Sequence, residues 1–96
     1  MTNILLVEDE MEVRDNIQEI LTAKNYNCLT ASNGKEAFDL LHDNKVDLII
    51  SDIMMPIMDG MSFYKKIVQE QKYWNVPFIF LSAKSDDDTV REGMKL

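Results

Sequence analysis

The chain has 96 residues, of which 46% are hydrophobic, which suits one small globular domain and is too short for two. Its formal net charge of -7 makes nucleic acid and anionic membranes poor partners, so we expect no direct nucleic-acid binding. Cys28 is the single cysteine and forms no internal disulfide. No apolar run is long enough to span a bilayer and the start lacks a signal-peptide profile, so we expect no membrane association and a cytoplasmic location.

The first third of the chain predicts a strand, a helix and a second strand. Residues 4–7 form a continuous apolar run, which is typical of a central parallel strand covered on both faces. Apolar residues then recur at helical spacing opposite charged residues and predict a crossover helix. These inward-facing residues are Val13, Ile17, Ile20 and Leu21. Residues 26–31 mix polar and apolar side chains, which favours a strand at the sheet edge.

A second crossover helix is predicted from Ala37, Leu40 and Leu41, which share one helical face. Asn33, followed three residues later by Glu36, resembles a capping box at its start. His42 falls in the last turn of this helix, where a cation suits the helix dipole. We therefore do not expect His42 to be a catalytic or phosphorelay histidine.

A third strand and helix follow. Residues 48–50 form a second continuous apolar run and predict a central strand. Gly60 opens a helix whose inward residues are predicted to be Phe63, Ile67 and Val68. The third repetition of strand and helix indicates an α/β fold with parallel strands.

The last quarter of the chain continues this alternation. Tyr73 and Trp74 fall in a loop and are expected to cover the core. Residues 78–81 form another apolar strand, and a fourth helix is predicted from Ser85 through Met94, where acidic residues favour a helix start. The whole pattern predicts a doubly wound parallel sheet with right-handed crossovers.

Acidic residues follow two of the predicted strands. The first strand ends at Glu8, Asp9 and Glu10, and the third ends at Asp52. In open parallel sheets the functional site lies beyond the carboxyl ends of the strands, so these acids should meet if the two strands are neighbours. Each acid alone could cap a turn or helix. Together they form a cluster that capping does not require and that Mg²⁺ would neutralise.

Three motifs carry a resemblance to a known family. They are LLVEDE at residues 5–10, DIMMPIMDG at residues 52–60, and PFIFLSAK at residues 77–84. Their order and spacing over the whole chain are similar to those of the response-regulator receiver domain of two-component signalling. The resemblance implies a flavodoxin-like fold with strand order 2-1-3-4-5 and a phosphorelay function that switches an output domain or downstream protein.

The resemblance also implies roles for individual residues. Asp52 is then the acceptor of a phosphoryl group from a sensor histidine kinase, and the domain assists its own phosphorylation and dephosphorylation without being an enzyme in the usual sense. Glu8 and Asp9 bind Mg²⁺ together with Asp52 and the backbone carbonyl of Met54. Ser82 contacts the phosphoryl group through its hydroxyl. The physical chemistry agrees, because phosphoryl transfer to a carboxylate needs a cation between two anionic groups.

Two further features follow from the positions of residues near the end of the chain. Ala83 is small and leaves space for the phosphoryl group to enter. The chain ends at Leu96, before the family's fifth strand with its lysine and switch aromatic. We therefore expect residues 1–96 to be a receiver domain without the last strand and helix. With residues 78–81 then at a bare sheet edge, the chain should either associate with a second copy, by pairing or exchange of this strand, or be marginally stable and poorly soluble.

Three alternatives remain open beside this interpretation. A cluster of methionines (Met54, Met55, Met58 and Met61) could ligate Cu(I), although packing over the loop is the simpler explanation. A flavodoxin-like cofactor site is disfavoured, because the acids after the first strand would repel a phosphate. The third alternative is a protein-interaction module of the same fold that acts without phosphorylation.

Overall fold

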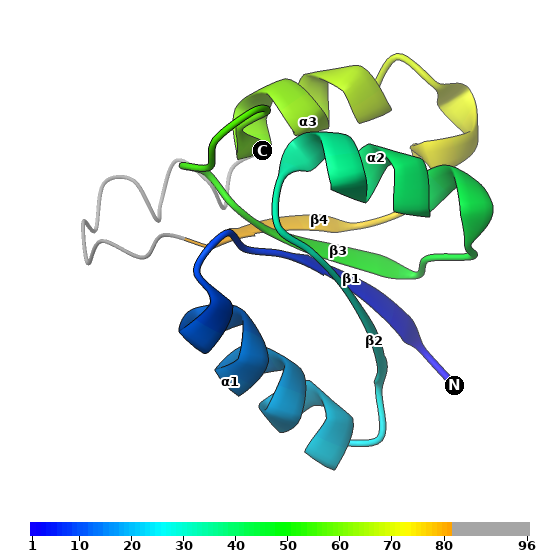
Figure 1. Cartoon of the computed structure of the whole chain (residues 1–96). Coiled ribbons are helices and arrows are strands. Elements are labelled where there is room, and N and C mark those ends of the chain that lie inside the picture. The colour runs from blue at the N-terminus through cyan, green and yellow to red at the C-terminus, as the bar shows by residue number, and fades with distance from the viewer. Residues whose placement is uncertain (82–96) are drawn as a thin grey trace.

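The computed structural model describes residues 1–81 and contains a four-stranded parallel sheet (Figure 1). The strands are β1 (Asn3–Val7), β2 (Asn27–Ala31), β3 (Leu48–Asp52) and β4 (Phe78–Leu81). Their order is β2-β1-β3-β4, so the chain reverses direction across the sheet after β2. This order confirms the doubly wound α/β prediction and places the polar strand β2 at an edge, where fewer residues need to be apolar.

The helices cover the two faces of this sheet. They are α1 (Met11–Ala23), α2 (Gly34–Asp43) and α3 (Gly60–Ile67), with a short 3-10 helix, η1 (Gln71–Tyr73), before β4. Helices α2 and α3 lie together on one face, and α1 lies on the other (Figure 1). No helix within residues 1–81 is long and apolar enough to cross a membrane. The predicted helix from Ser85 to Met94 lies outside the described residues.

The main core lies between the sheet and the α2–α3 layer. It joins alternate residues of the central strands, such as Leu5 and Ile49, to the inward faces of the two helices. The predicted inward residues Ala37, Leu41, Phe63 and Ile67 are all buried in it, and Leu40 packs against it while half-buried. Burial of these side chains is the main stabilising term for the α2–α3 layer, because each removes apolar surface from water.

Three predicted inward residues are exposed instead. Ile20 in α1 is 56% exposed, Val68 just after α3 is 40% exposed, and Trp74 is 64% exposed. Val13, Ile17 and Leu21 already form the side of α1 that faces the sheet, so Ile20 falls beside that stripe. Val68, the C-cap residue of α3, keeps helical dihedral angles and donates its N–H to the carbonyl of Tyr64, but its side chain falls beside the buried stripe of Phe63 and Ile67.

Trp74 is oriented by its ring nitrogen. The indole N–H donates to the carbonyl of Val68 at 2.8 Å, and the ring stays at the surface, whereas Tyr73 packs against the core as predicted. A buried indole must keep a partner for its only donor, and the free carbonyl at the end of α3 offers one at the surface. The hydrogen bond therefore explains why Trp74 does not cover the core.

Helix caps fix the loops at the carboxyl end of the sheet. Asn33 accepts the N–H of Glu36 at 2.9 Å at the start of α2. The Glu36 carboxylate accepts from Ser32 instead of returning to the N-cap residue, so only half of the predicted capping box forms. Asp59 caps α3 by accepting the N–H of Ser62 at 2.8 Å, and this hydrogen bond lowers the pKa of Asp59.

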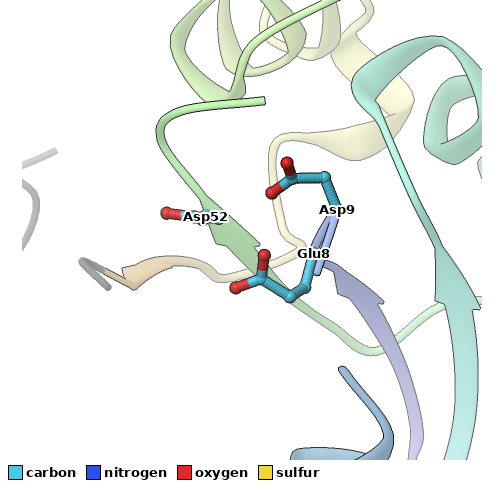
Figure 2. A group of neighbouring side chains, drawn as sticks. All are labelled: Glu8, Asp9 and Asp52. Carbon is cyan, nitrogen blue, oxygen red and sulfur yellow. The ribbon is translucent and has the colours of Figure 1, made fainter. Parts of the chain in front are cut away.

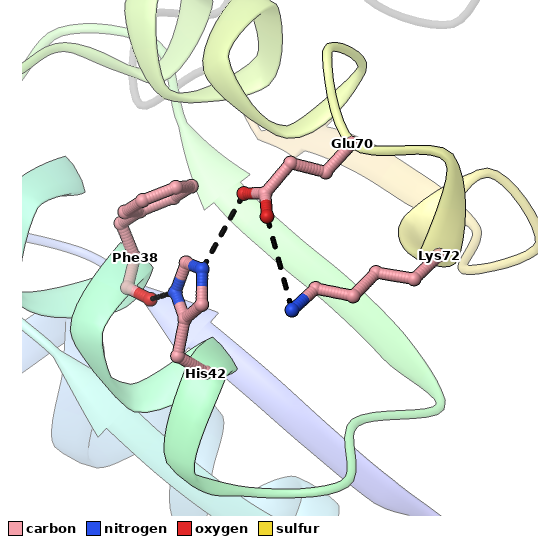
Figure 3. A network of polar contacts seen from close by, with 4 residues as sticks. All are labelled: Phe38, His42, Glu70 and Lys72. Atoms are coloured by element: carbon pink, nitrogen blue, oxygen red, sulfur yellow. Dashed lines mark hydrogen bonds and ion pairs between the residues drawn. The ribbon is translucent and has the colours of Figure 1, made fainter.

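A polar network joins α2 to the segment after α3 (Figure 3). Nδ1 of His42 lies 2.8 Å from the carbonyl oxygen of Phe38, and Nε2 lies 3.4 Å from a carboxylate oxygen of Glu70. The same carboxylate lies 3.8 Å from the ammonium of Lys72. The His42 ring also stacks edge-on against Phe38, with centroids 4.4 Å apart. His42 thus makes its contacts at the end of α2 away from the carboxyl edge of the sheet.

Candidate functional site

The predicted cluster of acids forms at the carboxyl ends of β1 and β3. These strands pair in parallel with Val7 opposite Ser51, so Glu8 and Asp52, one position further along each strand, end side by side. One carboxyl oxygen from each of Glu8, Asp9 and Asp52 lies within 4.8 Å of the other two. Figure 2 shows the three carboxyl groups beyond the strand ends. The convergence predicted from the sequence is therefore observed.

Glu8 is the most buried of the three acids, with 2% of its surface exposed. Its carboxylate accepts the N–H of Glu10 at 3.1 Å, which orients the side chain across the β1–α1 turn. The pKa of Glu8 is raised to about 7, first by burial and also by a hydrogen bond with Asp9 and the charges of Asp52 and Asp9, while the Glu10 hydrogen bond opposes the rise. Keeping Glu8 ionised therefore costs free energy unless a cation is present.

Asp52 is also buried, with 5% of its surface exposed, whereas Asp9 is exposed. Oδ1 of Asp52 accepts the N–H of Ile53 at 2.8 Å, which fixes the plane of the carboxyl group. Burial raises the pKa of Asp52, and the backbone N–H groups of Ile53 and Met54 partly oppose that rise. The site thus combines two buried carboxyl groups, those of Glu8 and Asp52, with the exposed carboxyl group of Asp9.

The loop after β3 brings α3 close to Asp52. Gly60 donates its N–H to the carbonyl of Ile53 at 2.8 Å. A Cβ at Gly60 would collide with the carbonyl oxygen of Asp52, so only glycine allows this approach. Gly60 therefore contributes to the site by its lack of a side chain.

The same loop is attached to α2 through a tight turn. Met58 donates its N–H to the carbonyl of Pro56 at 2.7 Å, and its own carbonyl accepts the N–H of Gly34 at 2.9 Å. Ile57, between them, has a φ of 69°, a strained conformation for a β-branched residue, and its side chain is 80% exposed. The loop that follows Asp52 is thus restrained at both ends.

Among residues 1–81, no basic side chain forms an ion pair with the three acids. The ion pairs in this part of the chain involve only His42, Lys72 and Glu70, far along the chain from Glu8 and Asp52. A cluster of carboxylates of this kind suits a hard divalent cation, since Mg²⁺ prefers oxygen ligands and completes its octahedral shell with waters. The donor set therefore fits Mg²⁺.

The methionines divide between packing and exposure. Met55 and Met58 pack against the core, which agrees with their predicted packing role. Met54 follows Asp52 by two residues, and its side chain is 68% exposed. Sulfur ligation of Cu(I) requires thioethers gathered around one point. Two of the four thioethers, those of Met55 and Met58, pack against the core instead.

Two predicted site residues, Ser82 and Ala83, lie outside the described residues. Sequence reasoning also missed a residue that contacts the site, Arg14, whose Nη1 donates to the carbonyl oxygen of Glu8 at 2.9 Å. Its position one helical turn after Glu10 is the only sequence signal that could have indicated this contact.

Comparison with known proteins agrees with this geometry. The profile of the response regulator receiver domain family matches residues 4–96. The "probable transcriptional regulator ycf29" of Porphyra purpurea is 45% identical over 82 residues, which cover 85% of this chain and 39% of that protein. The chain thus spans well under half the length of this relative.

Solved structures show the same arrangement. Chemotaxis response regulator CheY4 of Vibrio cholerae superposes with a TM-score of 0.87 and 29% identity, over 99% of this chain and 79% of that one. The response regulator TrrA of Thermotoga maritima, solved in complex with Mg(2+)-BeF, gives a TM-score of 0.79 and 35% identity over 88% of this chain and 72% of that one. By its sequence match, strand order and acidic site, the chain belongs to the response regulator receiver domain family of two-component signalling.

Proposed function

We propose that Asp52 accepts a phosphoryl group in a Mg²⁺-dependent step. The observation that supports this most directly is the cluster of Glu8, Asp9 and Asp52, one carboxyl oxygen of each lying within 4.8 Å of the others and none paired with a basic side chain of residues 1–81. In this proposal Glu8, Asp9, Asp52 and the backbone carbonyl of Met54 bind Mg²⁺. The bound ion would supply positive charge to offset both the carboxylates and the anionic phosphoryl group.

The chemistry places specific demands on Asp52. A carboxylate oxygen of Asp52 forms a new O–P bond while the P–N bond of a phosphohistidine breaks, and the leaving imidazole keeps the electron pair and takes up a proton. Asp52 must be ionised to attack, and its buried position opposes that ionisation. The N–H of Ile53 counters part of this effect and fixes the carboxyl orientation.

Other residues complete the proposal. Ser82 donates its hydroxyl to a phosphoryl oxygen, and the small side chain of Ala83 leaves room for entry. A sensor histidine kinase is the proposed phosphoryl donor, and the phosphorylated domain switches an output domain or downstream protein. Two relatives support this, because TrrA was solved with Mg(2+)-BeF at 35% identity and the Porphyra relative is named a transcriptional regulator.

Labelling by a small phosphodonor tests the acceptor assignment without any partner protein. The 96-residue chain is incubated with acetyl phosphate and Mg²⁺, and intact mass is measured for the wild type, Asp52→Asn and Asp39→Asn. Asp39 is an exposed acid on α2, so its variant controls for the same chemical change elsewhere. We expect Mg²⁺-dependent gain of one phosphoryl group in the wild type and in Asp39→Asn, and none in Asp52→Asn.

Two results would contradict the proposal. Equal labelling of Asp52→Asn would assign the acceptor elsewhere. A folded wild type that gains no phosphoryl group from acetyl phosphate, with or without Mg²⁺, would favour the remaining alternative, a receiver-like interaction module that acts without phosphorylation.

A further inference from the structure

Helix α1 begins without the side-chain cap that the other two helices have. Asn33 and Asp59 cap α2 and α3 by accepting backbone N–H groups, but Glu10, the N-cap residue of α1, makes no such hydrogen bond. The β1–α1 turn carries both Glu8 and Asp9, so its geometry decides where two of the three acids lie. The usual local restraint on this turn is missing.

Arg14 provides a restraint from one helical turn further on. Its Nη1 donates to the carbonyl oxygen of Glu8 at 2.9 Å, and its backbone N–H donates to the carbonyl of Glu10 at 2.9 Å. On the other side, the N–H of Glu8 donates to the carbonyl of Ala31 at 3.0 Å. Glu8 is thus fixed through both of its backbone polar groups, and the contact from Arg14 is the one made by a side chain.

The group to which Arg14 donates determines whether the acidic carboxylates stay free for a metal ion. Its guanidinium contacts a carbonyl oxygen, and among residues 1–81 it forms no ion pair with a carboxylate. An arginine that paired with Glu8 or Asp9 would compete with a metal ion for the same oxygens. Arg14 instead stabilises the turn and leaves the carboxylates available.

We infer that Arg14 is a positioning residue of the acidic site, which keeps Glu8 and Asp9 in the geometry that binds Mg²⁺. The inference rests on the proposed function, because it assumes that the site binds this ion. Groups that orient metal ligands from outside the coordination shell commonly change metal affinity by about tenfold or more when removed.

If Arg14 acted through its charge alone, its removal would change the Mg²⁺ affinity in the opposite direction. Removing a cation beside three carboxylates increases the local negative potential, so a purely electrostatic role for Arg14 predicts tighter Mg²⁺ binding in a neutral variant. A purely structural role elsewhere predicts a lower melting temperature with unchanged affinity. Loss of positioning predicts weaker binding, so the direction of the change separates the three roles.

The experiment measures Mg²⁺ affinity by following backbone amide NMR shifts of Glu8 to Glu10 during a MgCl₂ titration of the 96-residue chain. Arg14→Met removes charge and donor, and Arg14→Lys keeps the charge and an N–H donor. Lys24→Met at the far end of α1 is the matched control for charge removal. We expect the Mg²⁺ dissociation constant to rise roughly tenfold in Arg14→Met, to recover largely in Arg14→Lys, and to stay unchanged in Lys24→Met.

A second readout needs no metal. The N–H of Glu10 donates to the Glu8 carboxylate, so its hydrogen exchange in metal-free protein should be faster in Arg14→Met than in the wild type. If Arg14→Met does not fold, Arg14→Gln takes its place, because glutamine suits a helix but is too short to reach the carbonyl. Unchanged or tighter Mg²⁺ binding in the neutral variant would overturn the inference and leave the proposed function intact. Absence of Mg²⁺ binding by the wild type would contradict the proposed function itself.

Discussion

Two groups of charged residues in this domain are built in opposite ways. At the carboxyl ends of β1 and β3, three acids lie together, two of them buried, and no basic side chain in the described part of the chain pairs with them. At the far end of α2, Glu70 lies between His42 and Lys72 and is about one-third exposed. The first group concentrates negative charge away from water, and the second compensates it at the surface.

This difference fits the proposed binding site at the strand ends and a structural contact at the end of α2. Like charges held together in a buried place reduce stability, and a protein retains them where a ligand compensates the cost. A partly exposed ion pair contributes little in either direction. Neutralising one acid should therefore stabilise the metal-free protein at the strand ends and weaken it at the α2 network.

The largest expected effect is on the pH dependence of metal-free stability. The pKa of Glu8 is raised from 4.5 to about 7 in the folded state, so its contribution to stability is present below pH 4.5 and is lost as pH rises through about 7. Glu8→Gln cannot ionise, and its amide oxygen can still accept the Glu10 N–H. At about pH 8, the free energy of unfolding of Glu8→Gln should exceed that of the wild type by up to roughly 3 kcal/mol.

Urea unfolding in EDTA at about pH 5 and about pH 8 checks this expectation. The advantage of Glu8→Gln over the wild type should be large at the higher pH and small at the lower one. Glu19→Gln, an exposed change on α1, is the control and should follow the wild type at both. A constant difference between Glu8→Gln and the wild type would show that Glu8 does not titrate as its burial implies.

Adding Mg²⁺ should produce the next largest effect. If the ion binds only the folded state, a concentration about 100 times its dissociation constant stabilises the protein by roughly 2.7 kcal/mol. The measurement is the urea midpoint with and without Mg²⁺ at about pH 8, above the pKa of Glu8. Asp39→Asn should respond as the wild type does, and Asp9→Asn should respond less. A midpoint insensitive to Mg²⁺ but raised by Cu(I) would favour the methionine alternative.

The sheet could be predicted from the sequence because its strands carry a strong local signal. Residues 4–7 and 48–50 are uninterrupted apolar runs, and only a position between two helical layers buries both of their faces. The exposed Val68 and Trp74 show where such signals fail. The apolar character of Val68 does not reveal that it falls beside the buried stripe of Phe63 and Ile67, and no pattern reveals which carbonyl an indole N–H will find.

The candidate site divides in the same way. The meeting of Glu8 and Asp52 follows from strand order, because parallel neighbours end at the same edge. The contact of Arg14 depends on the angle between β1 and α1, which no residue type encodes by itself. Gly60 marked a helix start in the sequence, but its close approach to the Asp52 carbonyl is a tertiary feature. The positions of the clustered acids were therefore predictable, and the residues that support them were not.

The smallest expected effect concerns the compensated group. The Glu70 carboxylate lies 3.8 Å from the ammonium of Lys72 and 3.4 Å from Nε2 of His42, and it is partly exposed. Because a partly exposed ion pair contributes little, Glu70→Gln should destabilise the protein by only about 0.5 kcal/mol. Urea unfolding at about pH 8 measures this, with Glu19→Gln again as the control. If Glu70→Gln stabilised the protein, as Glu8→Gln is expected to do at the same pH, the contrast between the two groups would not hold.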